Sequence, residues 1–350
     1  MAVSPKAQRR PKKTFSLFPA LLVLVLLLIA YRQLRKDLLF VARPLRVGDE
    51  EEKVAFATLL LPPDPKETNL VEAERYFTSS RTLNYQLQHC KSTRSKTPIP
   101  FLVLTTPDVP HYQAIQLADE GATIIPIDLI PVPTWVKPGV SRWQNVMSKL
   151  RLFELTSYSR ILFLDADTFI LHPMDGIFSD PFSYPTNTSQ VVAKESKEAL
   201  LPPTYLFASL PEVLHTTHPY PPHAWKSFNA GFFLFSPSIL LFNYYLSLLN
   251  TTNKFDPTYP EQSLLNHAHR EWGNMPWQRL SGRKGEWNIN LPNMNDVRRG
   301  VRSVHAKLWW EGTELQRNER ELRRGWEKVR GEMERFYYER KRGHRREGVD

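Results

Sequence analysis

The sequence predicts an α/β domain built around a mostly parallel sheet. Apolar runs with strand character alternate with segments of helical spacing, at the lengths typical of βαβ units. One run, Ile161–Leu164, is wholly apolar, which is typical of a strand buried on both faces between layers of helices. The chain has 350 residues, 41% of them apolar, which is enough to bury one good-sized core.

The first half of the domain alternates regularly between strands and helices. A β-rich run comes first, and Tyr76, Leu83 and Leu87 then recur near one face of a helix. The predicted elements are, in order, a strand over Lys53–Leu61, a helix over Val71–Gln88, a strand over Ile99–Thr106, a helix over His111–Glu120, a strand over Ala122–Ile127, a helix over Val146–Tyr158 and the strand that ends at Asp165.

The second half is less regular. A Pro- and His-rich loop is predicted over Pro202–His223, and the apolar run Asn229–Ser238 leads into a helix over Ile239–Leu249. Gly231 inside that run indicates either a bend or close backbone approach, or only local packing. Residues 311–350 are rich in both charges and poor in apolar residues, which favours a solvated or partly disordered helical tail.

An apolar segment near the N-terminus predicts a membrane anchor. Phe15–Tyr31 is uncharged and as a helix would span about 25 Å. An uncleaved anchor is favoured over a signal peptide, since basic residues follow and no small-x-small cleavage site lies near Ala30. Sequons at Asn187 and Asn250 favour a lumenal body, hence a single-pass type II protein of the Golgi or ER membrane. The predicted parts are a cytosolic tip (1–14), the anchor (15–31), a stem (32–52), a catalytic domain (53–310) and the tail (311–350).

Charge and cysteine content exclude several classes of function. The formal net charge is +10, but residues 1–50 hold ten Lys/Arg against three Asp/Glu, and residues 311–350 hold twelve against ten. This leaves 24 against 23 for residues 51–310, so the central region is nearly neutral, which argues against a nucleic-acid partner. The single cysteine, Cys90, excludes an internal disulfide and a cysteine-rich zinc site.

Asp165 and Asp167 directly follow the apolar strand. In an extended segment residues two apart point to the same side, so the two carboxylates lie together while Ala166 points away. Carboxylates at the carboxyl end of such a strand suit Mg²⁺ or Mn²⁺, and an ion there could neutralise a diphosphate. The alternative is a pair of solvated turn residues, or Asp167 as a helix cap.

The segment Met147–Phe178, "MSKLRLFELTSYSRILFLDADTFILHPMDGIF", resembles the core signature of glycosyltransferase family 8, which includes glycogenin, galactinol synthase and fungal Golgi N-acetylglucosaminyltransferases. Four further motifs fall in the family's order: "AFATLL" at Ala55, "FNAGFFLFSPS" at Phe228, "PEQSLLN" at Pro260 and "VRSVHAKLWW" at Val301. The resemblance implies a GT-A (Rossmann-like) fold, a UDP-sugar donor, a divalent metal, usually Mn²⁺, and transfer with retention at the anomeric carbon.

The resemblance also implies a set of site residues. Asp165 and Asp167 would ligate the metal with His305 as third ligand, although a lone histidine beside tryptophans is more often packed scaffold. Ala166 would lie within the donor-binding motif. Lys307 would contact the diphosphate or be a surface lysine.

Further matches concern the donor and the reacting carbon. Lys149 matches a lysine near the donor, although a helical lysine is usually exposed to solvent. Asn229, Ala230 and Gly231 match a loop along the donor sugar. Gln262 matches a residue near the reacting carbon, and its neighbour Glu261 stands where many members have Asp. Tyr76 would stack on uracil or be part of the core.

The expected function is therefore a membrane-anchored, metal-dependent retaining glycosyltransferase acting on a glycan or glycoconjugate. N-acetylglucosamine is the favoured sugar, and glucose, galactose and glucuronate are alternatives. Self-glucosylation is disfavoured because 288–303 contains no tyrosine. A haloacid dehalogenase-like phosphatase also fits "LDADT" but needs later motifs that the chain lacks in order. A non-catalytic scaffold is the third candidate, although Asp165, Asp167 and His305 are all present.

Overall fold

The computed structural model describes residues 52–62, 70–191, 197–223, 226–280, 282, 285–309 and 320–347. The predicted tip, anchor and most of the stem lie outside the described residues, within the separate N-terminal unit Met1–Glu51. Among the helices that are described, none combines the length and the apolar character needed to cross a bilayer.

The core is a seven-stranded mixed sheet in which parallel pairs predominate. The strand order is β10-β8-β9-β4-β1-β2-β3, and β9 alone runs antiparallel to its two neighbours, β4 and β8. This confirms the predicted α/β class with a mostly parallel sheet. The strands are β1 (Val54–Leu60), β2 (Phe101–Thr105), β3 (Thr123–Pro126), β4 (Arg160–Leu164), β8 (Phe207–Pro211), β9 (Phe228–Phe235) and β10 (Gln278–Arg279).

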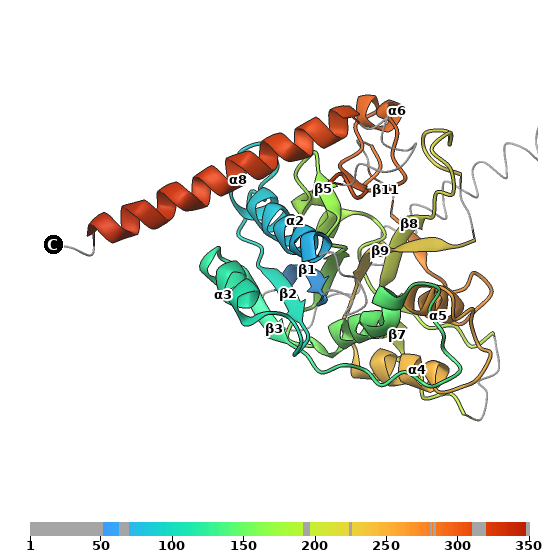
Figure 1. The fold of residues 1–350 in the computed structure, drawn as a ribbon. Coiled ribbons are helices and arrows are strands. Elements are labelled where there is room, and N and C mark those ends of the chain that lie inside the picture. Colours follow the sequence, from blue (N-terminus) through green and yellow to red (C-terminus); the bar gives the residue numbers. More distant parts are fainter. Residues whose placement is uncertain are drawn as a thin grey trace, which may run out of the picture. The chain divides into compact units, whose positions relative to one another are not determined.

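Helices cover both faces of this sheet (Figure 1). On β4, Ile161 and Phe163 join the core cluster that contains the apolar residues of α4 (Ile239–Leu249) and α5 (Pro260–Ala268). Leu162 and Leu164 join the cluster beneath α2 (Leu70–Gln88) and α3 (His111–Asp119). All five residues of β4 are buried, so the strand is covered on both faces as the sequence predicted.

A smaller three-stranded sheet extends the edge where β4 ends. It consists of β5 (Thr168–Ile170), β11 (Ile289–Asn290) and β12 (Ser303–His305), with β12 antiparallel to β5. The register places His305 opposite Thr168, which brings the end of the domain beside the residue that follows Asp167. The remaining short elements are η2 (Asp175–Ser179), β6 (Thr186–Asn187) paired with β7 (Thr204–Tyr205), and α6 (Met294–Arg298).

Two predicted elements differ from the structure. The helix predicted over Val146–Tyr158 is a 3₁₀ helix, η1, over Ser141–Glu154. The loop predicted over Pro202–His223 contains β7 and β8, and β8 is a fully buried strand inside the main sheet. The flanking prolines favoured a loop, which is why the strand was not predicted. Pro211 is tolerated because it lies at the end of β8, beside an irregularity in the pairing with β9.

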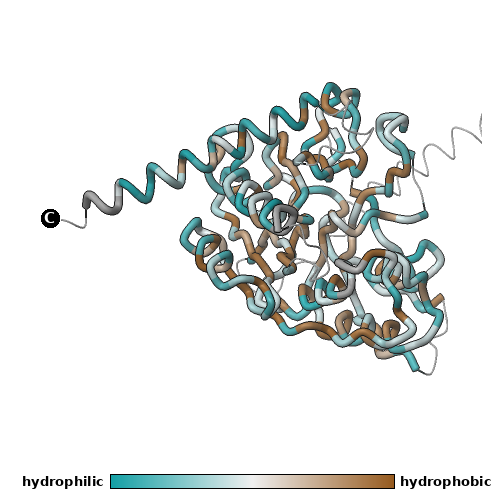
Figure 2. The backbone as a smooth tube through the Cα atoms, in the orientation of Figure 1, coloured by the Kyte–Doolittle hydropathy of each residue, from teal (hydrophilic) through white to brown (hydrophobic). Residues whose placement is uncertain are grey.

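The tail was predicted to be solvated, and for one face this is wrong. Residues Arg320–Glu347 form the helix α8, with Leu322, Trp326, Met333 and Tyr337 buried on one side. Trp326 packs against Trp309 with ring centroids 5.9 Å apart, and Met333 and Tyr337 cluster with Tyr85 and Cys90. One apolar residue per turn is enough to bury one face of a helix. The C-terminal end of α8 projects past the body, and hydrophilic positions predominate along this part of the helix (Figures 1 and 2).

Trp326→Ala is expected to destabilise the fold by about 3 kcal/mol, because it removes a buried aromatic ring from the contact between α8 and the body. Tyr338→Ala, in the same helix but at a position 62% exposed, should change stability by less than about 0.5 kcal/mol. Urea denaturation of both variants measures the difference. Equal losses in the two variants would show that α8 does not pack as described.

Candidate active site

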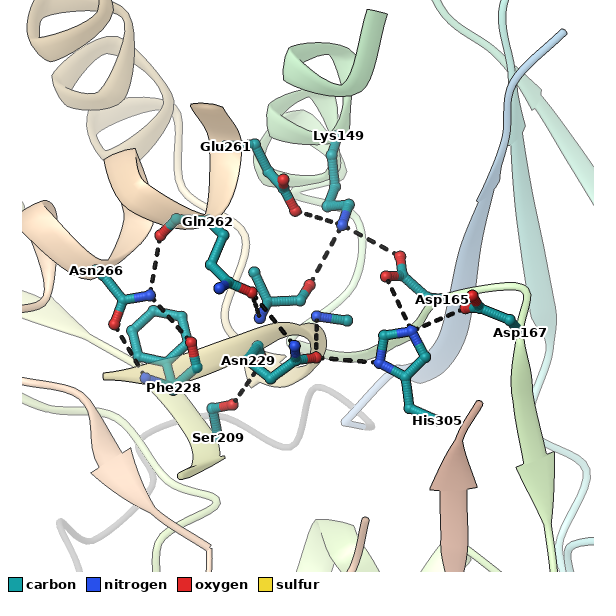
Figure 3. Close-up of polar contacts among 12 residues, drawn as sticks. Lys149, Asp165, Asp167, Ser209, Phe228, Asn229, Glu261, Gln262, Asn266 and His305 are labelled. Atoms are coloured by element: carbon teal, nitrogen blue, oxygen red, sulfur yellow. Dashed lines mark hydrogen bonds and ion pairs between the residues drawn. The ribbon is translucent and has the colours of Figure 1, made fainter. Parts of the chain in front are cut away.

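The two aspartates lie where the main sheet passes into the smaller one. The backbone N–H of Asp165 donates to the carbonyl of Gly231 (2.8 Å), and the chain then turns so that the N–H of Thr168 donates to the carbonyl of Asp165 (2.9 Å). This turn starts β5, whose pairing with β12 delivers His305. Nε2 of His305 lies 2.9 Å from Oδ1 of Asp167 and 3.7 Å from Oδ2 of Asp165 (Figure 3).

These three side chains form a candidate metal site. One ligand atom from each of Asp165, Asp167 and His305 lies within 4.8 Å of the others. Burial would raise the pKa of Asp167, but the His305 ring and Lys307 hold it below its usual range. Burial would lower the pKa of His305, but Asp167 and Asp165 raise it. A divalent cation could replace the His305 proton between these carboxylates, and carboxylate and imidazole donors suit Mn²⁺ or Mg²⁺.

Asn229 fixes the orientation of the His305 ring. Its Oδ1 accepts from the N–H of Gly231 (3.0 Å) and lies 3.1 Å from Nδ1 of His305. Since that oxygen is an acceptor, Nδ1 of His305 carries a proton and Nε2 faces the carboxylates. A hydrogen bond from the other ring nitrogen is how proteins commonly orient a metal-binding histidine.

Gly231 lies in close contact with the candidate ligands. A Cβ at this position would lie 2.3 Å from Cε1 of His305 and 2.7 Å from Oδ2 of Asp165. Of the two alternatives left by the sequence, the structure therefore confirms a close backbone approach. Only glycine leaves room for His305 and Asp165 to converge here.

Lys149 is buried at the centre of the charged network rather than exposed. It extends from η1, and its Nζ lies 3.1 Å from Oδ1 of Asp165, 3.3 Å from the carbonyl of Ala230 and 2.5 Å from Oε1 of Glu261. Burial would lower the pKa of Lys149, but the Asp165 and Glu261 carboxylates raise it well above its ordinary value. Burial raises the pKa of Glu261, and Lys149 opposes that shift. The buried ammonium therefore balances two carboxylates.

Gln262 lies beside this network with both ends of its amide engaged. Its Oε1 accepts from the N–H of Ala230 (3.0 Å) and from Nδ2 of Asn229 (3.3 Å). Its Nε2 donates to Oε1 of Glu212 (2.9 Å). Gln262 thus connects α5 to the loop of residues 229–231.

Glu212 was missed by the sequence analysis. It directly follows β8, and since β8 runs in the same direction as β4, its carboxylate lies at the same edge of the sheet as Asp165. Burial raises the pKa of Glu212, although the hydrogen bonds with Gln262 and Ser227 lower it in part. An acidic residue at the end of a strand was the available signal, but β8 had been predicted as loop.

Tyr76, Lys307 and Ala166 lie at the margin of the network. Nζ of Lys307 is 5.6 Å from the centroid of the Tyr76 ring, which meets Trp309 edge to face at 5.2 Å. Tyr76 is partly buried and packs against two core clusters, as its alternative interpretation predicted. Its role toward uracil stays a prediction, as does that of Lys307 toward a diphosphate. Ala166 is buried between the two aspartates.

Comparison with known proteins identifies relatives of this chain. No family model matches it. An uncharacterized protein of Schizosaccharomyces pombe is 28% identical over 321 residues, which cover 83% of this chain and 80% of that protein. Galactinol synthase 1 of Solanum lycopersicum is 28% identical over 176 residues, covering 49% of this chain and 51% of the relative.

Solved structures align with this chain only loosely. The apo form of the glycosyltransferase GlyE from Streptococcus pneumoniae TIGR4 aligns over 83% of this chain and 64% of its own, with 11% identity and a TM-score of 0.47.

Together the parallel-rich sheet, the Asp-Asp-His cluster and these relatives support a glycosyltransferase. The galactinol synthases are members of glycosyltransferase family 8, so the resemblance to that family is confirmed. The narrower likeness to fungal N-acetylglucosaminyltransferases stays a prediction.

Gly231→Ala should weaken Mn²⁺ binding by at least about tenfold, because the added Cβ displaces His305 or Asp165. Gly325→Ala is the matched control, since its nearest neighbour would lie 3.6 Å away, an ordinary contact. Titration of the free Mn²⁺ signal by electron paramagnetic resonance measures the affinity. Unchanged Mn²⁺ binding in a folded Gly231→Ala protein would place the metal elsewhere.

Proposed function

We propose that this chain is a metal-dependent, retaining glycosyltransferase of GT-A fold that transfers a sugar from a UDP-sugar to a glycan or glycoconjugate. The observation that carries the proposal is the convergence of Asp165, Asp167 and His305 at the carboxyl edge of a parallel-rich sheet. Open α/β sheets bind their ligands at this edge. The galactinol synthase relatives support sugar transfer as the chemistry performed there.

The side chains present fit a divalent ion. Asp165, Asp167 and Nε2 of His305 offer two hard oxygen ligands and one imidazole, and Gly231 leaves the space in which they meet. A bound Mn²⁺ or Mg²⁺ would supply positive charge to the diphosphate of the donor. Lys149 donates to Oδ1 of Asp165 (3.1 Å), and Asn229 directs Nε2 of His305 to the site.

Other residues would bind and orient the donor. In this proposal Lys307 adds a point charge near the diphosphate and Tyr76 contacts the uracil. Ala166 lies within the donor-binding motif, between the two aspartates. The backbone of residues 229–231 lies along the donor sugar. Gln262 is held by Ala230 and Glu212 with its amide next to this loop, where it can contact an oxygen at the reacting carbon.

The arrangement of the glutamates favours front-side attack over double displacement. A covalent route needs a free carboxylate next to the reacting carbon. Glu261 is paired with buried Lys149, and Glu212 accepts from Gln262 while burial raises its pKa. Neither is poised as a nucleophile, so we propose that the acceptor hydroxyl attacks on the face that UDP leaves.

The proposed sugar, membrane topology and class of partner rest on the sequence. N-acetylglucosamine is the proposed sugar, with glucose, galactose and glucuronate as alternatives. Phe15–Tyr31 is the proposed anchor of a type II protein of the Golgi or ER membrane, with the catalytic domain lumenal. The nearly neutral central region supports a partner other than nucleic acid. The transferase relatives favour sugar transfer over a haloacid dehalogenase-like phosphatase.

Purified protein should release UDP from one of a panel of UDP-sugars when Mn²⁺ and a mixture of glycan acceptors are present, and chelation should abolish the release. Asp167→Asn should lower the rate of UDP release by at least about a hundredfold. The substitution removes a carboxylate ligand of the metal and the negative charge that pairs with His305. Asp256→Asn, on an exposed loop, is the control. Phosphate release from a phosphoester would favour the phosphatase, and inactivity of the folded protein on every donor would favour a scaffold.

A further inference from the structure

Two aromatic side chains, called the rim pair below, meet near the N-terminal ends of η1 and α5, the helices that carry Lys149, Glu261 and Gln262. The rings of Trp143 and Tyr259 have centroids 5.4 Å apart and are tilted by 45°. Tyr259 is 51% exposed and Trp143 is partly exposed, and Val140 beside them is 37% exposed. Large aromatic residues usually bury most of their surface, so an exposed pair of this kind requires an explanation.

The elements that carry this pair also carry residues of the site. In a 3₁₀ helix residues three apart lie above one another, so Trp143, Val146 and Lys149 share one face of η1, with Trp143 about 12 Å along from Lys149. Tyr259 is the N-cap of α5, and Glu261 and Gln262 follow in its first turn. Each element therefore carries a polar group of the site and, nearer its N-terminal end, one ring of the aromatic pair.

The position of the pair is fixed by a backbone contact. The N–H of Gly139, just before η1, donates to the carbonyl of Thr258, just before Tyr259 (3.0 Å). A Cβ at Gly139 would lie 2.9 Å from Cγ2 of Thr258, which is closer than a real Cβ contact. The two segments can therefore pass this close to each other because residue 139 is a glycine. This holds the two rings in a set arrangement before any ligand arrives, which lowers the cost of binding.

From this geometry we infer that Trp143 and Tyr259 form the acceptor subsite, and that the acceptor is a saccharide whose pyranose ring packs on them. The inference rests on the proposed function and deepens it. A pyranose presents C–H groups on its faces and hydroxyls at its edge, which matches aromatic faces with a polar O–H and N–H at their rims. The platform is continuous with the site through the first turn of α5, so a bound ring can direct a hydroxyl toward Gln262.

The test compares transfer with donor hydrolysis in Trp143→Ala and Tyr259→Ala. Lactose, maltose, cellobiose, chitobiose and mannobiose serve as acceptors. The acceptor KM should rise roughly tenfold in each variant while the KM for the UDP-sugar changes less than about twofold, so the ratio of transfer to hydrolysis falls. Trp143→Phe should restore most of the acceptor affinity because it keeps an aromatic face.

Trp272→Ala is the matched control. Trp272 is 67% exposed but follows the opposite end of α5, so its loss should leave the acceptor KM unchanged. An unchanged acceptor KM in both rim variants overturns the subsite, and so does an equal rise in the KM for the UDP-sugar. A KM effect seen only with alkyl glycosides, and not with free saccharides, would identify an apolar aglycone as the occupant and also overturn it.

A binding measurement separates this inference from the proposed function. Intrinsic tryptophan fluorescence is titrated with the same saccharides, without donor or metal. A saccharide-dependent change that Trp143→Ala removes supports the subsite even if the wild-type protein releases no UDP. Failure of UDP release alone would refute the proposed transferase, whereas absence of any fluorescence response to saccharides would refute the subsite.

Discussion

The balance of buried charge around Asp165 is the interaction on which the candidate site depends. Lys149 lies next to one carboxylate oxygen of Asp165, and His305 lies next to the other. Lys149 also pairs with Glu261, and His305 also pairs with Asp167. Buried charges are costly unless they are paired. The pairing joins η1, α5, the end of β4 and β12, so their relative positions are fixed by electrostatics as well as by packing.

The main sheet makes this convergence possible. Lys149, Asp165, Gly231, Glu261 and His305 are spread over more than 150 residues of sequence, yet they meet where β4 ends. The antiparallel strand β9 passes beside β4 and brings Gly231 against Asp165, and the small sheet turns His305 inward. The absent side chain of Gly231 supplies the space at the centre. The rim pair Trp143 and Tyr259 then extends the same two elements toward solvent.

The sequence predicted the elements whose signal is local. Strands β1, β2 and β4 and helices α2, α3 and α4 follow from apolar runs and helical spacing, and the Asp-x-Asp pair from its place after a buried strand. The wider site came from family resemblance, because a network such as Lys149 with Glu261 links residues that no local pattern connects. Strand β8 was missed because prolines flank it, and Glu212 was missed with it. The buried face of α8 was missed because charged residues outnumber the few apolar ones that pack.

Pulsed electron paramagnetic resonance of the Mn²⁺-loaded protein can show whether Asp165, Asp167 and His305 together bind one divalent ion. A bound imidazole nitrogen gives a characteristic hyperfine coupling to Mn²⁺. We expect this coupling in the wild-type protein, its loss in His305→Gln, and its retention in His172→Gln, a histidine outside the cluster. A Mn²⁺ signal without nitrogen coupling, or a coupling that survives His305→Gln, would show that His305 does not bind the ion.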